Sequence, residues 1–237
     1  MKFSRLLLCP LLLCGLTACG GGSPGTAAAG VASSGVEGAV LYPPSTGTVT
    51  LEFDMGAQQL RPLVHFPVDR RGLYTITLPV PPQLSAGGQA EVLPLLPALD
   101  LLGFSRSQCP GGLKLSDSAA RFAVVSSAYF VPTGAATAAT LRLAGQAMAG
   151  QNTQTINLWR QYAYADRTVH LSGTQTCTLS RSDSSSQSAQ IDVDYQLRQG
   201  WNVLVIQTVQ DGTAPLTGRA TVASGLSGVQ WHYVPPS

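Results

Sequence analysis

Apolar and polar residues alternate along much of this chain, and this constrains its fold more than any other feature. In the segment 48–54, Val49, Leu51 and Phe53 are apolar and the residues between them are polar, and the segment 73–78 repeats the pattern. Successive side chains of a β-strand point to opposite faces, so each segment predicts a strand with one apolar face. Clusters of Gly, Pro, Ser, Asn and Asp separate such segments, as is typical of an all-β sandwich or barrel.

The same alternation continues after residue 121 and predicts eight further strands. Their expected bounds are 122–131, 137–148, 153–165, 168–179, 189–198, 201–209, 218–223 and 229–234. We therefore expect an all-β chain built as an antiparallel β-sandwich, either one extended sandwich or two small ones. The expected division runs between an N-terminal β region, residues 39–110, and a C-terminal sandwich region, residues 118–237.

The clearest hairpin is predicted around Gln199 and Gly200. Residues before this turn alternate, with these apolar members expected to face inward: Ile191, Val193, Tyr195 and Leu197. Residues 203–206, Val-Leu-Val-Ile, are apolar at every position, which indicates a central strand covered on both faces.

Residues 79–116 break the alternation with six prolines and many leucines. Here we expect an irregular insertion with room for one short helix between Leu95 and Leu102. Leucines of this insertion would pack over an open end of the sandwich: Leu93, Leu96, Leu99 and Leu102. The alternative is an exposed apolar lip for a ligand.

The N-terminus has the pattern of an export signal. Lys2 and Arg5 precede a short apolar run that Pro10 interrupts and Gly15 ends, so the run is shorter than the roughly 20 apolar residues of a membrane-spanning helix. The segment closes with Leu16-Thr17-Ala18-Cys19, which resembles the lipobox of bacterial lipoproteins.

The resemblance implies a signal peptide at residues 1–18 and a lipid on Cys19. It also implies attachment to a membrane through that lipid and a place in the cell envelope. Position 20 is Gly, not the Asp of an inner-membrane retention signal, which favours the outer membrane over the inner membrane. The alternative is an ordinary secretory signal cleaved near Ala18, with Cys19 left as a free thiol. Residues 19–38 are rich in Gly, Ala and Ser and are expected to form a flexible tether with a mean reach of about 20–25 Å.

Two weaker resemblances concern the body. Residues 35–53 followed by Gly-Leu-Tyr-Thr-Ile-Thr-Leu-Pro resemble the opening hairpins of carboxypeptidase-regulatory or transthyretin-like β-sandwiches. The stretch ending Leu197-Arg-Gln-Gly-Trp-Asn202 resembles a hairpin of uncharacterised bacterial envelope β-domains. Both resemblances imply a fold and no function.

Two cysteines, Cys109 and Cys177, remain in the body once the signal and Cys19 are set aside. An even pair in an exported protein predicts a disulfide, and strand parity turns Cys177 toward the core. The bond would close a loop of about 69 residues and stabilise the fold by roughly 4 kcal/mol in the chain-entropy model. The alternative is two separately buried thiols.

Motifs typical of zinc peptidases, paired-cysteine sites and P-loop nucleotide sites are absent from the sequence: it has no HExxH, C-x-x-C or P-loop pattern. Three histidines occur, and His170 and His232 are expected to be exposed. Asp192 and Asp194 share a strand face with Gln196 and Arg198, a spacing compatible with calcium, with Asp183 as a further ligand, or with an inverting glycosidase. A solvated polar face is the interpretation we adopt, without a catalytic, metal or cofactor site.

Charge and aromatic residues complete the expectation. The net charge of +2 comes from 14 basic and 12 acidic residues with no basic cluster, which argues against nucleic acid as a partner. Most aromatic residues are expected in the core, with an exposed pair as a sugar or peptide platform the alternative. We expect a non-enzymatic structural or interaction protein of the envelope with a protein or glycan partner, and as alternatives a secreted hydrolase, including one acting on glycans, or a small-ligand carrier.

Overall fold

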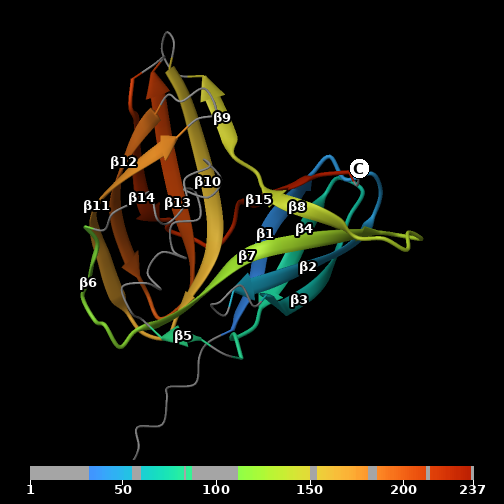
Figure 1. Cartoon of the computed structure of the whole chain (residues 1–237). Coiled ribbons are helices and arrows are strands. Elements are labelled where there is room, and N and C mark those ends of the chain that lie inside the picture. The colour runs from blue at the N-terminus through green and yellow to red at the C-terminus, as the bar shows by residue number, and fades with distance from the viewer. Residues whose placement is uncertain are drawn as a thin grey trace, which may run out of the picture.

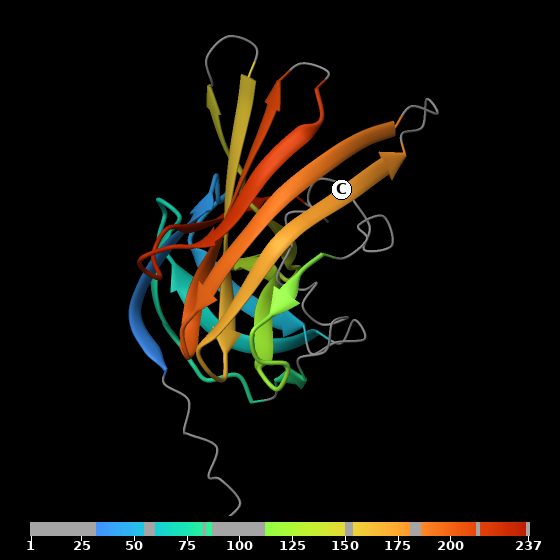
Figure 2. The same ribbon diagram turned by 90° about the vertical axis from the view of Figure 1, so that its left-hand side faces the viewer.

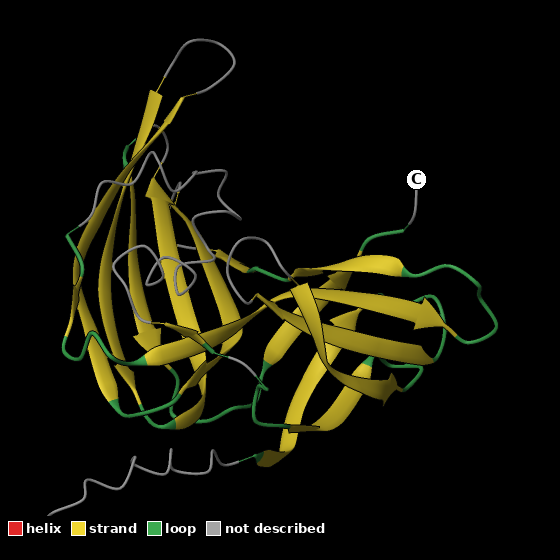
Figure 3. Cartoon of the chain, turned by 60° about the horizontal axis from the view of Figure 1, so that its bottom comes forward, coloured by secondary structure: helices red, strands yellow, loops and turns green. Residues whose placement is uncertain are grey.

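The structure is a computed structural model that describes residues 32–54, 60–82, 84–86, 112–149, 154–180, 186–211 and 214–235 of the 237-residue chain. Strands and connecting loops, without a helix, make up this part, so the all-β prediction is confirmed (Figure 3). The strands are β1 (Ser33–Leu41), β2 (Gly47–Asp54), β3 (Leu60–Val68), β4 (Leu73–Leu78), β5 (Ser85–Ala86), β6 (Lys114–Leu115), β7 (Arg121–Pro132), β8 (Ala139–Leu143), β9 (Gln146–Ala149), β10 (Gln154–Ala165), β11 (Val169–Ser180), β12 (Ser186–Leu197), β13 (Gly200–Asp211), β14 (Leu216–Val222) and β15 (Val229–Tyr233).

All strands belong to one sheet that curls into two lobes (Figure 1). In the first lobe the order is β3-β2-β7-β8-β15-β1-β4, and in the second lobe it is β7-β10-β13-β14-β12-β11-β6, so β7 belongs to both. The antiparallel expectation needs a correction, because β1 pairs with β15 and β12 pairs with β14 in parallel. Both parallel pairs join strands that are not consecutive in the sequence, which alternation within single strands does not reveal.

The hairpin predicted around Gln199 and Gly200 is wrong. β14 lies between β12 and β13, parallel to the first and antiparallel to the second, as Figure 2 shows among the orange and red strands. Asn202 holds the turn open: its Oδ1 accepts from Arg198 N at 3.0 Å, and its Nδ2 donates to Arg198 O and Gly200 O at 2.8 and 3.0 Å. These bonds satisfy the backbone groups that a hairpin ladder would otherwise pair.

Two hydrophobic cores fill the two lobes, and alternate residues of the shared strands supply both. In β10, Tyr162 and Tyr164 enter the first core and Ala163 and Ala165 enter the second. In β13, Val203 belongs to the first core, whereas Leu204 and Ile206 belong to the second. The expectation of a strand covered on both faces is therefore confirmed for residues 203–206, of which only Val205 is half-buried.

The lobes separate where β7 leaves β10. The two strands pair only between residues 122–124 and 163–165. Beyond that point the buried Gln161 donates from Nε2 to Val125 O at 2.6 Å, so a side chain takes the place of the ladder. The expected division at residues 110–118 does not separate the cores, because β7, β8 and β15 of the C-terminal region complete the first lobe.

The tether is shorter than expected. The composition of residues 33–38 predicts that they belong to it, but they lie in β1, where Val36 is buried and pairs with Ile76 of β4. Pairing on both edges of β1 therefore overrides a sequence poor in apolar residues. The signal, Cys19 and most of the Pro/Leu-rich insertion, including the helix expected between Leu95 and Leu102, lie outside the described residues.

Candidate functional site

One face of β12 gathers the polar side chains singled out from the sequence. Asp192, Gln196 and Arg198 are exposed and Asp194 is half-buried. The alternate residues are buried in the second core, as expected: Ile191, Val193, Tyr195 and Leu197. The period of two that predicted this strand therefore also placed its functional groups on the outer surface.

Each of the two aspartates on this face has a partner on the neighbouring strand β11. Asp194 Oδ1 lies 2.8 Å from His170 Nε2, and Thr174 Oγ1 donates to Asp192 Oδ1 at 2.8 Å. His170 and His232 are both exposed, as predicted. The carboxylates thus bind cross-strand neighbours, and within the described ranges no group of three or more His, Cys, Asp or Glu side chains is arranged to hold a metal ion.

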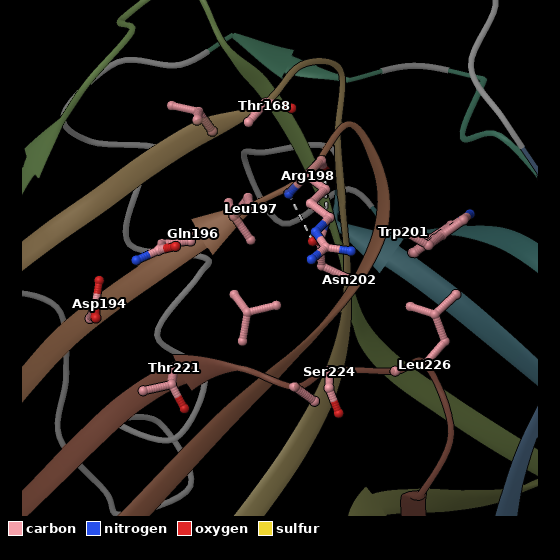
Figure 4. Close-up of a pocket in the computed structure, with 14 residues that line it drawn as sticks. Thr168, Asp194, Gln196, Leu197, Arg198, Trp201, Asn202, Thr221, Ser224 and Leu226 are labelled. Atoms are coloured by element: carbon pink, nitrogen blue, oxygen red, sulfur yellow. Dashed lines mark hydrogen bonds between the residues drawn. The ribbon is translucent and has the colours of Figure 1, made fainter.

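A groove of about 700 Å³ lies next to this face, at the seam between the two lobes (Figure 4). It is formed by the ends of β12 and β14, the starts of β11 and β13, and the segment that crosses from β14 toward β15. Its lining residues are Thr168, Val169, Asp194, Gln196, Leu197, Arg198, Trp201, Asn202, Thr221, Val222, Ala223, Ser224, Gly225 and Leu226. In Figure 4, Asp194, Gln196 and Arg198 lie along one side and Thr221 and Ser224 along the other.

Contacts between the lobes fix the walls of this groove. Trp201 donates from Nε1 to Pro79 O of the first lobe at 2.9 Å, and its ring meets that of Tyr164 edge to face at 5.4 Å. Ala223 N donates to Val203 O at 2.9 Å, which ties the crossing segment to β13. Because these groups are bonded before any ligand arrives, the groove is a preformed cavity.

The charges around the groove differ in how far they are compensated. Arg167, beside the lining residue Thr168, contacts Asp166 at 3.1 Å and Asp117 at 3.1 Å. The hydrogen bond from the backbone N–H of Ala119 is the main cause that lowers the pKa of Asp117 from its usual value, and the hydrogen bond from Arg167 lowers it further. Asp194 contacts His170, whereas the Arg198 guanidinium has no ion-pair partner among the described residues.

A hydrolase would need a nucleophile or an activated water beside the His170 and Asp194 pair. The pair lies at the rim of the groove, since Asp194 is a lining residue, and this favours the hydrolase alternative more than two separate surfaces would. However, no Ser, Thr or Cys side chain of the described residues hydrogen-bonds the imidazole, and the side chains of His170 and Asp194 are 46% and 44% exposed. A Ser-His-Asp arrangement is therefore not formed by these residues.

The remaining candidates from the sequence are placed as follows. Cys177 is fully buried in the second core, as its parity predicted, but Cys109 and Asp183 lie outside the described residues. Most of the described aromatic residues of the second half are buried, which confirms core packing for them: Phe122, Phe130, Tyr162, Tyr164, Tyr195, Trp201 and Trp231. Sequence reasoning missed the exposed Tyr42, whose ring contacts that of His232 edge to face at 5.7 Å.

It also missed the groove, because strands distant in sequence and a crossing segment form it. The one sequence feature that pointed to this place is Asn202, a polar residue that follows Gln-Gly-Trp directly before the apolar run 203–206. Comparisons with protein-family models, curated proteins and solved structures found no match to this chain. Among the described residues no helix is long and apolar enough to span a membrane.

Proposed function

We propose that this chain is a lipid-anchored cell-envelope protein that binds a ligand or partner in the seam groove and performs no chemistry on it. The groove carries the proposal: it is the place where the ends of β12 and β14, the starts of β11 and β13, and the crossing segment present hydroxyl, amide and charged groups to one cavity of about 700 Å³. Cavities of this size that combine apolar walls with a few convergent polar groups are the usual ligand sites of proteins.

The anchor in this proposal is Cys19 in the lipobox-like Leu16-Thr17-Ala18-Cys19, with Gly20 favouring the outer membrane. Lipid chains on one residue, each contributing about 0.8 kcal/mol per buried CH₂, anchor a protein stably when there are several. When cells are grown with an alkyne fatty acid, the wild-type protein should become labelled and the Cys19→Ala variant should not. Equal labelling of the two would contradict the anchor.

Crosslinking with mass spectrometry in the native envelope tests the binding role. Thr221→Trp fills the groove from a half-buried position, and the matched control Thr137→Trp adds the same ring to an exposed turn. We expect crosslinks from groove residues to one partner in the wild type and the control, and their loss in Thr221→Trp. Crosslinks that survive Thr221→Trp unchanged would overturn the role of the groove.

The second candidate is an envelope hydrolase, and the 2.8 Å contact between His170 and Asp194 favours it. Incubation of the protein with envelope glycans and peptides separates the two functions. A hydrolase releases products, and His170→Gln abolishes that release, whereas a binding protein releases no products.

A further inference from the structure

Arg198 is the one charged lining residue of the groove that lacks a charged or imidazole partner among the described residues. Of the other charged groups, Asp194 contacts His170, and Arg167, adjacent to the lining, contacts two carboxylates. We propose that the groove binds a small polar molecule through an oxyanion, a carboxylate or a phosphate, held by Arg198. This inference rests on the proposed binding role of the groove and names the chemistry of the ligand.

The guanidinium suits this ligand class because its planar fork of N–H groups matches carboxylate and phosphate oxygens. The backbone of Arg198 is held in place, because its N–H donates to Asn202 Oδ1 at 3.0 Å and its carbonyl accepts from Asn202 Nδ2 at 2.8 Å. Binding therefore has to order only the side chain of Arg198, which lowers the entropy cost of forming the complex.

Hydroxyl and amide groups around Arg198 supply further donors. Thr168 Oγ1 accepts from Gln199 N at 3.4 Å, so its own O–H remains available to donate into the groove. Gln196 and Ser224 are exposed lining residues with side chains that donate hydrogen bonds. Asn202 differs, because the turn already uses both its oxygen and its nitrogen. Because His170 contacts the Asp194 carboxylate, which is the other charged lining group, the groove offers an anion one cation and several neutral donors, a combination that suits a polar molecule with a single anionic group.

A matched set of sugars tests the proposal directly on the full chain purified from envelopes. Glucose, glucuronate and glucose 6-phosphate share a pyranose ring and differ at carbon 6, where they carry a neutral hydroxymethyl group, a carboxylate or a phosphate. Calorimetric titration at low salt should show binding of at least one anion and a weaker or absent signal for glucose. Equal binding of all three sugars, or no binding of either anion at millimolar concentration, would overturn the proposal.

The variants assign the site. Arg198→Gln should weaken anion binding by about tenfold or more, and Arg198→Lys should recover part of that loss, because a charge remains without the planar fork. Arg219→Gln is the control: Arg219 is exposed on the neighbouring strand β14 and does not line the groove. An Arg198→Gln variant that binds like the wild type, with an unchanged melting temperature, would contradict the assignment.

Two further arms identify the source and separate this inference from the binding role. Vesicles of phosphatidylglycerol and of phosphatidylcholine test a lipid headgroup, and sedimentation that depends on both phosphatidylglycerol and Arg198 would identify that source of the anion. Sedimentation independent of Arg198, together with absent sugar binding, would overturn the proposal. If the envelope crosslinks depend on an open groove but none of these anions binds, the binding role stands and only the oxyanion inference fails.

Discussion

The two lobes are built from the same sheet, yet their cores differ in composition. The first core is rich in large aromatic side chains, among them Phe53, Phe130, Tyr162 and Trp231, which are all fully buried or nearly so. The second core consists mainly of Ala, Val, Leu and Ile, with Phe122 and Tyr195 as its buried aromatic residues. The boundary between these compositions runs through single strands, since Tyr164 and Ala165 are neighbours in β10 and enter different cores.

Because the same strands contribute to two cores of different composition, the lobes are not separate domains. A domain has a core of its own and few contacts across its boundary, whereas here β7, β10 and β13 place one face in each core. We expect the lobes to unfold together, and the seam groove to keep its shape for that reason.

The largest expected effect comes from Trp231→Ala in the first core. Trp231 is 1% exposed, and truncation of a buried Trp costs about 3–5 kcal/mol. Leu171→Ala is the counterpart in the second core and should cost about 2–5 kcal/mol. Urea unfolding followed by tryptophan fluorescence and by far-UV circular dichroism should give one coincident transition for both variants. Two transitions in either variant would show that the lobes unfold separately.

The expected disulfide between Cys109 and Cys177 gives the next effect. Reduction should lower the free energy of unfolding by roughly 4 kcal/mol, because the closed loop of about 69 residues restricts the unfolded chain. Titration of thiols in the unfolded protein without reductant, in the Cys19→Ala background and after removal of the signal, should find none. Two free thiols would contradict the bond.

Two buried tyrosines distinguish the cores at the level of single hydroxyls. Tyr195 OH in the second core has no hydrogen-bond partner among the residues that the structure describes, whereas Tyr74 OH in the first core donates to Val229 O at 3.3 Å. Tyr195→Phe should therefore stabilise the protein by about 1 kcal/mol, and Tyr74→Phe should destabilise it by about the same amount. A loss of stability in Tyr195→Phe would contradict the orphaned hydroxyl.

The same two tyrosines predict that the stability of the folded protein falls at alkaline pH. Burial raises the pKa of Tyr195 and raises that of Tyr74 to about 12. A raised pKa in the folded state means that the unfolded chain loses its protons first, so stability should fall as the pH rises above about 10. Tyr195→Phe should reduce this fall, as measured by urea unfolding at pH 8 and about pH 10.5.

The smallest expected effect concerns Tyr42, next to the first core. Its side chain is 80% exposed, and its φ of 56° lies in the left-handed region, which residues other than glycine rarely adopt. Tyr42→Gly should raise the free energy of unfolding by up to about 1 kcal/mol. Gly35→Ala, at a φ of 69°, is the matched reverse change and should lower it by a similar amount. Equal effects of the same sign would show that backbone strain is not what distinguishes these positions.

Alternation within strands predicted much of this fold, because burial of one face is a local property of the sequence. It placed Ile191 inward and Asp194 outward, and it found β7, β10 and β13 to within two residues at either end. It failed for the order of the strands, where β14 separates β12 from β13, since pairing depends on contacts between distant segments. The groove depends on that order, so the sequence predicts a shared face for Asp194, Gln196 and Arg198 but not the groove that they line.

Hydrogen exchange of backbone amides tests the central claim, that the two lobes form one cooperative body with a preformed groove at their seam. The slowest amides of β2 in the first lobe and of β12 in the second should exchange with the same free energy, equal to that of global unfolding. Amides around Arg198 and Asn202 that are hydrogen-bonded should be protected without added ligand. Exchange of one lobe at a free energy several kcal/mol below the other would contradict the account, because the groove, or the contact that Trp201 makes with the first lobe, would then open without global unfolding.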